Sequence, residues 1–234
     1  MQPKELLWFA ACFTLLLTSL GMATAEAGKI SPVPGTVMFS FDQDAVGWPP
    51  AGFTSYATGE GPAGKWVVRE VAGAPRGKRV VAQTDANDTD NRFPVLIADK
   101  EDYADVDVSV KGKAISGKGD QGIGLVFRFR DPQSYYVVRA NALENNVRLY
   151  KMVDGRRKQF AGAEVQVTSG QWHTLRVVAR GDHILCYFDG QKLIDVHDAT
   201  YTKGKVGLWT KADSVTYFDE LTIEEGGKKR VIAF

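Results

Sequence analysis

The sequence predicts an all-β protein, an antiparallel sandwich or barrel, with no substantial helix in the mature chain. Apolar and polar residues alternate with a period of two in several segments, most clearly over 104–114 and 122–130. Turn sequences rich in Gly, Asn and Asp recur about every 8 to 12 residues. This combination is typical of antiparallel sandwiches and barrels, and the absence of an internal repeat argues against a propeller.

The turns mark where the strands begin and end. Asp131-Pro132-Gln133-Ser134 is a turn, because proline presets its own φ and aspartate can bond the nearby backbone. Asn145-Asn146 and Asp189-Gly190 suit tight hairpin turns, since these residues tolerate the positive φ that a type I′ turn requires. About fifteen strands are expected. The clearest cover 36–42, 65–71, 79–84, 93–98, 104–114, 123–130, 135–140, 147–153, 172–180, 183–188, 191–196, 205–210 and 215–224.

The first 25 residues have the features of a signal peptide. Lys4 gives a short basic start, residues 6–20 are apolar, and Ala23-Thr24-Ala25 matches the small-x-small rule for cleavage. The sequence therefore predicts an exported protein, periplasmic or extracellular, that is cleaved after Ala25. The alternative is an uncleaved membrane anchor, although the apolar run is shorter than the ~20 residues that a span needs. The expected organisation is a signal peptide (1–25), a linker (26–35), one jelly-roll domain (36–225) and a C-terminal tail (226–234).

Composition and charge narrow the possible partners. The chain has 234 residues, 44% of them hydrophobic, and a formal net charge of +1. A core can form from this content, and a net charge near zero with scattered Lys and Arg argues against nucleic-acid binding. No membrane partner is expected after cleavage, and the oligomeric state is not indicated. The one cysteine left after cleavage, Cys186, alternates with Ile184 and Phe188 and is expected to be buried.

Two blocks of the sequence resemble the concanavalin A-like lectin/glucanase jelly rolls. The first is GLVFRFRDPQSYYVVRANALENNVRLYK, residues 124–151. The second, residues 170–223, contains the W-x-x-L, DG, G-x-V-G-L and FD-x-L patterns that are common in laminin G-like and glucanase-like sandwiches. The chain is most similar to exported bacterial domains of the family 16 glycoside hydrolase-like and 3-keto-disaccharide hydrolase-like kinds. The resemblance implies a single-domain, two-sheet antiparallel jelly-roll sandwich, but the superfamily includes enzymes, lectins and structural modules.

No recognisable pair of catalytic carboxylates is present. Retaining glucanases of this superfamily carry their acids on one strand as E-x-D-x-E or E-x-D-x-x-E, which places both on one face. The chain has no such string. The nearest pattern, Asp105-x-Asp107, alternates with core valines and is expected on a solvated outer face. A second acid within ~10 Å of Asp213 or Glu144 would favour an enzyme.

Metal ligands are sparse. His173, His183 and His197 have no sequence spacing that suits a metal. Glucanases of the superfamily often hold one structural Ca²⁺ through an aspartate of the last strand, and the resemblance places Asp219 there, with Asp42 of the first strand as a second ligand. The alternative is that Asp219 bonds backbone at the end of its strand. No cofactor is expected to be required.

The candidate binding site is the concave face of the central three strands, opposite the core. Aromatic rings, guanidinium groups and glycines alternate onto that face, and sugars are bound by aromatic planes with planar hydrogen-bonding groups. The alternatives are a one-residue slip in alternation near Asp131, and a face covered by its own arginine stacking and salt links. The expected ligand-binding residues are Arg128, Tyr135, Arg139, Arg148, Tyr150 and Trp209.

The sequence therefore predicts an exported carbohydrate-binding or adhesion-type module without catalysis of its own. The expected partner is an oligo- or polysaccharide, with acidic saccharides among the candidates because of the paired arginines. One alternative is a glycoside hydrolase, glucanase-like or 3-keto-disaccharide hydrolase-like, with a non-standard arrangement of acids. Another is a purely structural accessory domain.

Overall fold

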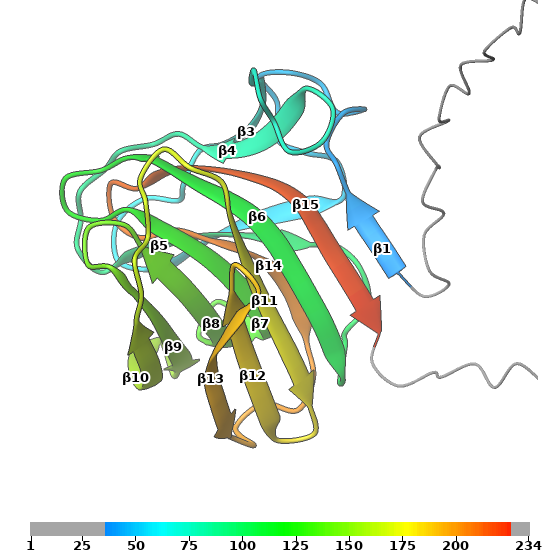
Figure 1. Cartoon of the computed structure of the whole chain (residues 1–234), viewed down its shortest axis with the longest axis vertical. Coiled ribbons are helices and arrows are strands. Elements are labelled where there is room, and N and C mark those ends of the chain that lie inside the picture. Colours follow the sequence, from blue (N-terminus) through cyan, green and yellow to red (C-terminus); the bar gives the residue numbers. More distant parts are fainter. Residues whose placement is uncertain (1–35, 226–234) are drawn as a thin grey trace, which may run out of the picture. The chain divides into compact units, whose positions relative to one another are not determined.

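The computed structural model describes residues 36–225, which form two antiparallel sheets packed face to face (Figure 1). Within this range there is no helix, so none that could cross a membrane, and the predicted all-β sandwich is confirmed. The signal peptide, linker and tail expected from the sequence lie outside the described residues. The strands are β1 (Thr36–Phe39), β2 (Phe53–Gly59), β3 (Trp66–Glu70), β4 (Arg79–Gln83), β5 (Arg92–Ala98), β6 (Val106–Ser116), β7 (Gly122–Asp131), β8 (Ser134–Asn141), β9 (Asn146–Val153), β10 (Arg156–Glu164), β11 (His173–Arg180), β12 (His183–Phe188), β13 (Gln191–His197), β14 (Lys205–Trp209) and β15 (Val215–Glu225).

The two sheets differ in the order of their strands. The eight-stranded sheet has the order β13-β12-β11-β6-β15-β4-β3, with β1 also paired to β15. The seven-stranded sheet has the order β10-β9-β8-β7-β14-β5-β2, so the consecutive strands β7, β8 and β9 are neighbours on one side of it. The predicted hairpin turn at Asp189-Gly190 is confirmed by positive φ at both residues, 46° and 82°. At the other predicted turn only Asn145 has a positive φ, 52°, and Asn146 already pairs with Asn141 as the first residue of β9, so the connection is longer than expected.

The main core lies between the sheets. Ile123, Leu125 and Phe127 of β7 point into it and belong to one cluster with Val108 and Val177 of the facing sheet. These are residues that strand alternation predicts to be buried. Cys186 is completely buried in the same cluster, as predicted.

A second apolar cluster lies on the opposite face of the seven-stranded sheet. Its members all come from that sheet and none from the other, so this face is turned away from the main core. The members are Phe93, Val95, Ile97, Val126, Phe129, Tyr135, Val137, Tyr150, Met152 and Trp209, with Tyr56 packed against them.

A bulge at Arg128 reverses the alternation of β7. Arg128 has a φ of 50°, and the register between β7 and β8 shifts between Phe127 and Asp131. Phe129 consequently joins Val126 in the second cluster, although simple alternation places it in the main core. The prediction that Arg128 lies on the same face as the other candidate residues is therefore wrong, because one inserted residue exchanges the two faces.

Arg128 instead ties three connecting segments together. Its guanidinium donates hydrogen bonds to the carbonyl oxygens of Ala104 at 2.9 and 3.2 Å, Gly181 at 2.7 Å and Tyr201 at 2.9 Å. The side chain is fully buried, and burial lowers its pKa. The donors of Arg128 are thus used within the fold.

Candidate functional site

Three of the predicted binding residues form one row on the outer face of the seven-stranded sheet. Trp209 is opposite Gly124, Gly124 is opposite Arg139, and Arg139 is opposite Arg148. Glycine is needed in this row, because a Cβ at position 124 would lie 2.7 Å from the Trp209 ring. The expected indole, Gly124 and two of the three expected guanidinium groups therefore share this face, whereas Arg128 does not.

Two of the predicted aromatic residues, Tyr150 and Trp209, lie beneath an arginine that the sequence analysis did not select. Tyr135 and Trp209 are completely buried, and Tyr150 is 6% exposed. The guanidinium carbon of Arg157 lies 4.5 Å from the ring centroid of Phe93, 4.7 Å from that of Tyr150 and 5.9 Å from that of Trp209. The rings thus form a floor on which the planar Arg157 side chain rests.

The contact between Arg157 and Phe93 shows that this face is concave. Arg157 is on β10 and Phe93 is on β5, five strands away in the sheet. At roughly 4.8 Å per strand these positions would be about 24 Å apart in a flat sheet, beyond the combined reach of the two side chains. The sheet must therefore curl until its two edges approach each other, and we call this side the concave face.

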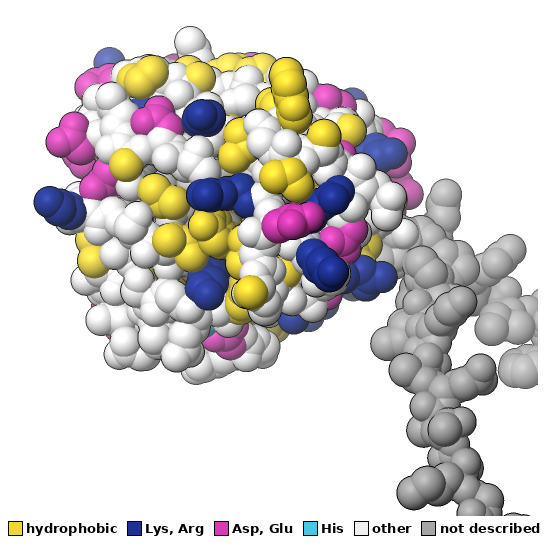
Figure 2. Space-filling view, turned by 90° about the horizontal axis from the view of Figure 1, so that it is seen from above, with side chains coloured by type: hydrophobic (Ala, Val, Ile, Leu, Met, Phe, Trp, Pro, Cys, Tyr) yellow, Lys and Arg dark blue, Asp and Glu magenta, His cyan; other side chains and the backbone are white. Residues whose placement is uncertain are grey.

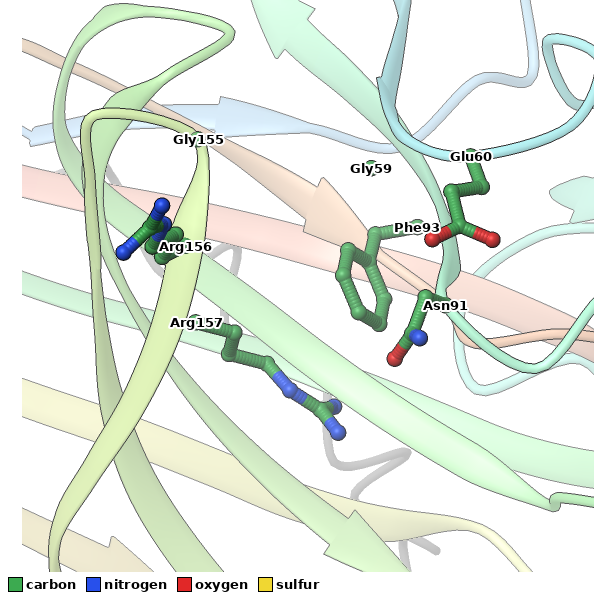
Figure 3. A pocket seen from close by; sticks show the side chains of 7 residues that line it. All are labelled: Gly59, Glu60, Asn91, Phe93, Gly155, Arg156 and Arg157. Carbon is green, nitrogen blue, oxygen red and sulfur yellow. The ribbon is translucent and has the colours of Figure 1, made fainter.

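A hollow of about 410 Å³ lies between the two edges of the curled sheet. Figure 3 shows the hairpin between β9 and β10 on one side, with Arg157 extending towards Phe93, and Asn91 and Glu60 on the other side. It is lined by Gly59, Glu60, Asn91, Phe93, Gly155, Arg156 and Arg157.

Two arginines of this face are neutralised by acids. Arg139 donates to Glu144 at 2.8 Å and to the Tyr150 hydroxyl at 3.2 Å. Burial opposes the negative charge of Glu144, but the hydrogen bonds from Arg139 and Asn146 outweigh it and lower the Glu144 pKa. Arg148 is paired with Glu164 at 2.5 Å. These are the salt links that the sequence analysis kept as an alternative.

Arg157 differs, because within residues 36–225 no carboxylate lies at ion-pair distance from it. Its Nη1 is buried without a hydrogen-bond partner, and burial lowers its pKa. A buried charge that no group of the protein pairs is costly, and a ligand of opposite charge would relieve that cost. The sequence held a signal for this residue, since the Asp154-Gly155 hairpin sets Arg157 opposite Met152, on the face of Tyr150.

Several buried polar atoms of the seven-stranded sheet and of the loop before β7 have no hydrogen-bond partner among the described residues. They include Oδ2 of Asp120, Nε of Arg139 and Nε1 of Trp209. Such atoms are uncommon in folded proteins and mark places where water or a ligand completes the hydrogen bonding. Asp120 is fully buried, with its Oδ2 3.6 Å from Nζ of Lys211, and burial raises its pKa.

Asp213 and Glu144 have different roles in this region. Asp213 accepts hydrogen bonds from the backbone N–H groups of Lys118, Gly119 and Asp120, at 2.5 to 3.1 Å, so it holds a loop. The charge of Glu144 contributes, after burial, to the raised pKa of Asp120. Asp120 is thus a second acid that interacts with Glu144.

The two predicted calcium ligands lie at the loop between β3 and β4. Asp42 accepts from the backbone N–H groups of Lys78 and Arg79 at 2.8 and 3.1 Å, and Asp219 accepts from Arg76 N–H at 2.9 Å. Burial and the charges of Glu220 and Asp42 raise the pKa of Asp219 to about 6. Two adjacent carboxylates suit a hard cation, but the bonds of Asp219 are those of the backbone alternative, so calcium stays a prediction.

Charge is mixed on the surface. Figure 2 shows Lys and Arg side chains interspersed with acidic ones and with exposed apolar groups on the visible face. That face has no single continuous basic patch of the kind that a nucleic acid would require.

Comparisons with known proteins agree with this geometry. The model of the family described as "3-keto-alpha-glucoside-1,2-lyase-like domain" matches residues 42–224. Levanase of Bacillus subtilis (strain 168) is 26% identical over 121 residues, which are 50% of this chain and 17% of that protein. The chain thus corresponds to a small part of that relative.

Solved structures show the same fold at low sequence identity. The carbohydrate-binding module CBM66 from Bacillus subtilis has a TM-score of 0.60 and 20% identity, covering 74% of this chain and 95% of that one. The exoplasmic/lumenal domain of VIP36, in a Ca²⁺/Man-bound form, has a TM-score of 0.56 and 11% identity, covering 85% of this chain and 92% of that one. The predicted jelly-roll class and the predicted family resemblance are confirmed.

Proposed function

Since the chain belongs to the 3-keto-alpha-glucoside-1,2-lyase-like domain family, we propose that it is an exported carbohydrate-binding protein whose concave face takes a saccharide. The names of two similar proteins support a carbohydrate ligand, one being Levanase and the other a carbohydrate-binding module. Export is supported by the apolar run of residues 6–20 and by the cleavage pattern at Ala23-Thr24-Ala25.

The observation that carries the proposal is Arg157 on its aromatic floor. A guanidinium group presents several donors in one plane, which suits the paired oxygens of a carboxylate or of neighbouring hydroxyls. The rings of Phe93 and Tyr150 hold that plane in place at 4.5 and 4.7 Å. Little side-chain entropy is therefore lost when a ligand binds to it.

The charges around the hollow favour an acidic saccharide in a defined orientation. Arg157 and Arg156 line one side, and Glu60 and Asn91 line the other. A sugar carboxylate would pair with Arg157, whereas ring hydroxyls would donate to the Glu60 carboxylate and exchange hydrogen bonds with Asn91. The opposite orientation would place the sugar carboxylate beside the Glu60 carboxylate and leave the Arg157 guanidinium unpaired.

Binding of oligogalacturonate and of a neutral galacto-oligosaccharide to the full chain tests the proposal by calorimetry, after a glycan array has checked wider specificity. The substitution Arg157→Gln should weaken binding about 10- to 100-fold, as expected for the loss of charged hydrogen bonds worth roughly 1.5–3 kcal/mol. Lys158→Gln is the matched control, because Lys158 is the next residue of β10 and faces the other side of the strand.

The outcomes separate the parts of the proposal. Equal binding of neutral and acidic ligands, with a loss in Arg157→Gln, would remove the acidic preference and keep the site. Unchanged binding in Arg157→Gln would place the ligand elsewhere. If the array shows no glycan binding at all, the carbohydrate function itself fails, and the structural accessory role becomes the better description.

An enzymatic function is the second candidate, and one observation favours it. Asp120 and Glu144 lie near Arg139, and their environments shift the two pKa values in opposite directions, upward for Asp120 and downward for Glu144. Such pairs are a feature of acid–base sites. Against it, Asp120 is fully buried and would have to become accessible before it could transfer a proton to a sugar. Cleavage of a 3-keto-glucoside that is lost in Asp120→Asn and Glu144→Gln would establish it.

A further inference from the structure

We propose a second site on this protein, for a late first-row divalent metal ion, at the edge of the eight-stranded sheet where His183 and His197 face each other. The two histidines lie on β12 and β13, in the sheet that does not carry the concave face. The proposal therefore does not depend on the saccharide site.

The strand register creates the pair. His183 and His197 are direct cross-strand partners, and their ring centroids are 4.5 Å apart with an angle of 5° between the rings. Both side chains are accessible, 41% exposed for His183 and 65% for His197. The spacing of the two histidines in the sequence does not indicate a pair. They become neighbours because the hairpin at Asp189-Gly190 folds β13 back onto β12.

Each imidazole is oriented by an acid through one nitrogen. Nε2 of His183 lies 2.7 Å from Oδ1 of Asp195, and Nδ1 of His197 lies 3.1 Å from Oδ1 of Asp182. Metal-binding histidines commonly have this partner, which fixes the tautomer and leaves the second nitrogen as the ligand. The nitrogens left here are Nδ1 of His183 and Nε2 of His197.

The surrounding charge favours a cation. Two carboxylates, those of Asp182 and Asp195, each contact one of the imidazoles, and Nζ of Lys192 lies 2.6 Å from Asp195. At their ordinary charges the two acids and the lysine sum to −1.

The ligand set determines the class of metal. Imidazole nitrogen suits Cu²⁺, Ni²⁺ and Zn²⁺, whereas Ca²⁺ and Mg²⁺ prefer oxygen. In residues 36–225 no group of three or more His, Cys, Asp or Glu side chains is arranged to hold a metal. The protein would therefore supply two nitrogens once the exposed rings turn out of their parallel stack so that the two lone pairs converge on the ion, and water would complete the coordination.

Titration of the untagged full chain with Cu²⁺ and with Zn²⁺, followed by calorimetry, tests the site. We expect saturable binding of one ion, weakened at least about tenfold in His183→Gln and in His197→Gln, and about tenfold in Asp195→Asn through the loss of the orienting acid. Gln191→Ala, at an exposed position of the same hairpin, is the control and should retain binding. Thermal unfolding verifies that each variant is folded.

A second readout uses the chain's third histidine. His173 is buried, with Nδ1 2.7 Å from Asp189, so it should not bind the ion. Substoichiometric Cu²⁺ should broaden the ring NMR signals of His183 and His197 and leave those of His173 unchanged. Absence of saturable binding, undiminished affinity in either glutamine variant, or selective broadening of His173 would overturn the proposal.

Discussion

Replacement of Arg128 by methionine provides the sharpest test of how β7 is built. Methionine keeps an unbranched apolar side chain but removes the guanidinium, which donates to the carbonyls of Ala104, Gly181 and Tyr201. Each hydrogen bond to a charged group is worth about 1.5–3 kcal/mol, and each buried carbonyl left without a donor costs roughly 1–3 kcal/mol. The terms are not additive, and the desolvation cost of the arginine is recovered. We expect a net loss of about 3–5 kcal/mol.

Urea unfolding measures this loss. With a slope of about 2–3 kcal/mol per molar, a loss of 4 kcal/mol would move the midpoint by about 1.3–2 M. Arg157→Met is the matched control, since Arg157 contacts aromatic rings at the hollow but bonds no carbonyl, and its cost should stay below about 1 kcal/mol. A loss below 1 kcal/mol for Arg128→Met, together with lost glycan binding, would refute the structural role and restore Arg128 as a ligand residue.

Two further predictions concern buried carboxyl groups. Burial raises the pKa of Asp120 above its ordinary 3.8, so its contribution to stability is full below that value and is lost as the pH rises through the folded-state pKa. The asparagine of Asp120→Asn cannot ionise, so the free energy of unfolding of this variant should rise relative to that of the wild type between pH 4 and pH 8. If the two free energies, measured by urea unfolding, instead change with pH in parallel, the pKa of the Asp120 carboxyl is not perturbed by folding. If Asp219 and Asp42 hold calcium, a chelator should lower the Tm of the wild type but not of Asp219→Asn. An unchanged wild-type Tm would remove the site.

Alternation and turn chemistry were enough to predict the sandwich and most of its strands. The row of Trp209, Arg139 and Arg148 over Gly124 also followed from alternation, because β8, β9 and β14 keep a regular pleat in this region. Arg128 could not be placed in this way. A bulge adds one residue without changing the apolar pattern around it, and Phe129 is hydrophobic on either face.

The remaining site residues depend on contacts between distant segments. Arg157 reaches Phe93 only because the seven-stranded sheet curls, and curvature is a property of the assembled sheet. His183 and His197 become neighbours through the register of β12 and β13. A single sequence contains neither of these distances, although its turns limit which strands can pair.

The curl of the seven-stranded sheet has a mechanical consequence. The rims of the hollow belong to β10 and to the β2 and β5 end of the same sheet, so the opening widens when the sheet flattens and narrows when it twists further. Flattening is shared among all the strand pairings between the rims, and each of them has to untwist only slightly. A molecule that touches both rims would act as a brace against this motion. Amide hydrogen exchange at β10 and at β2 should then slow together, although these strands are at opposite edges of the sheet.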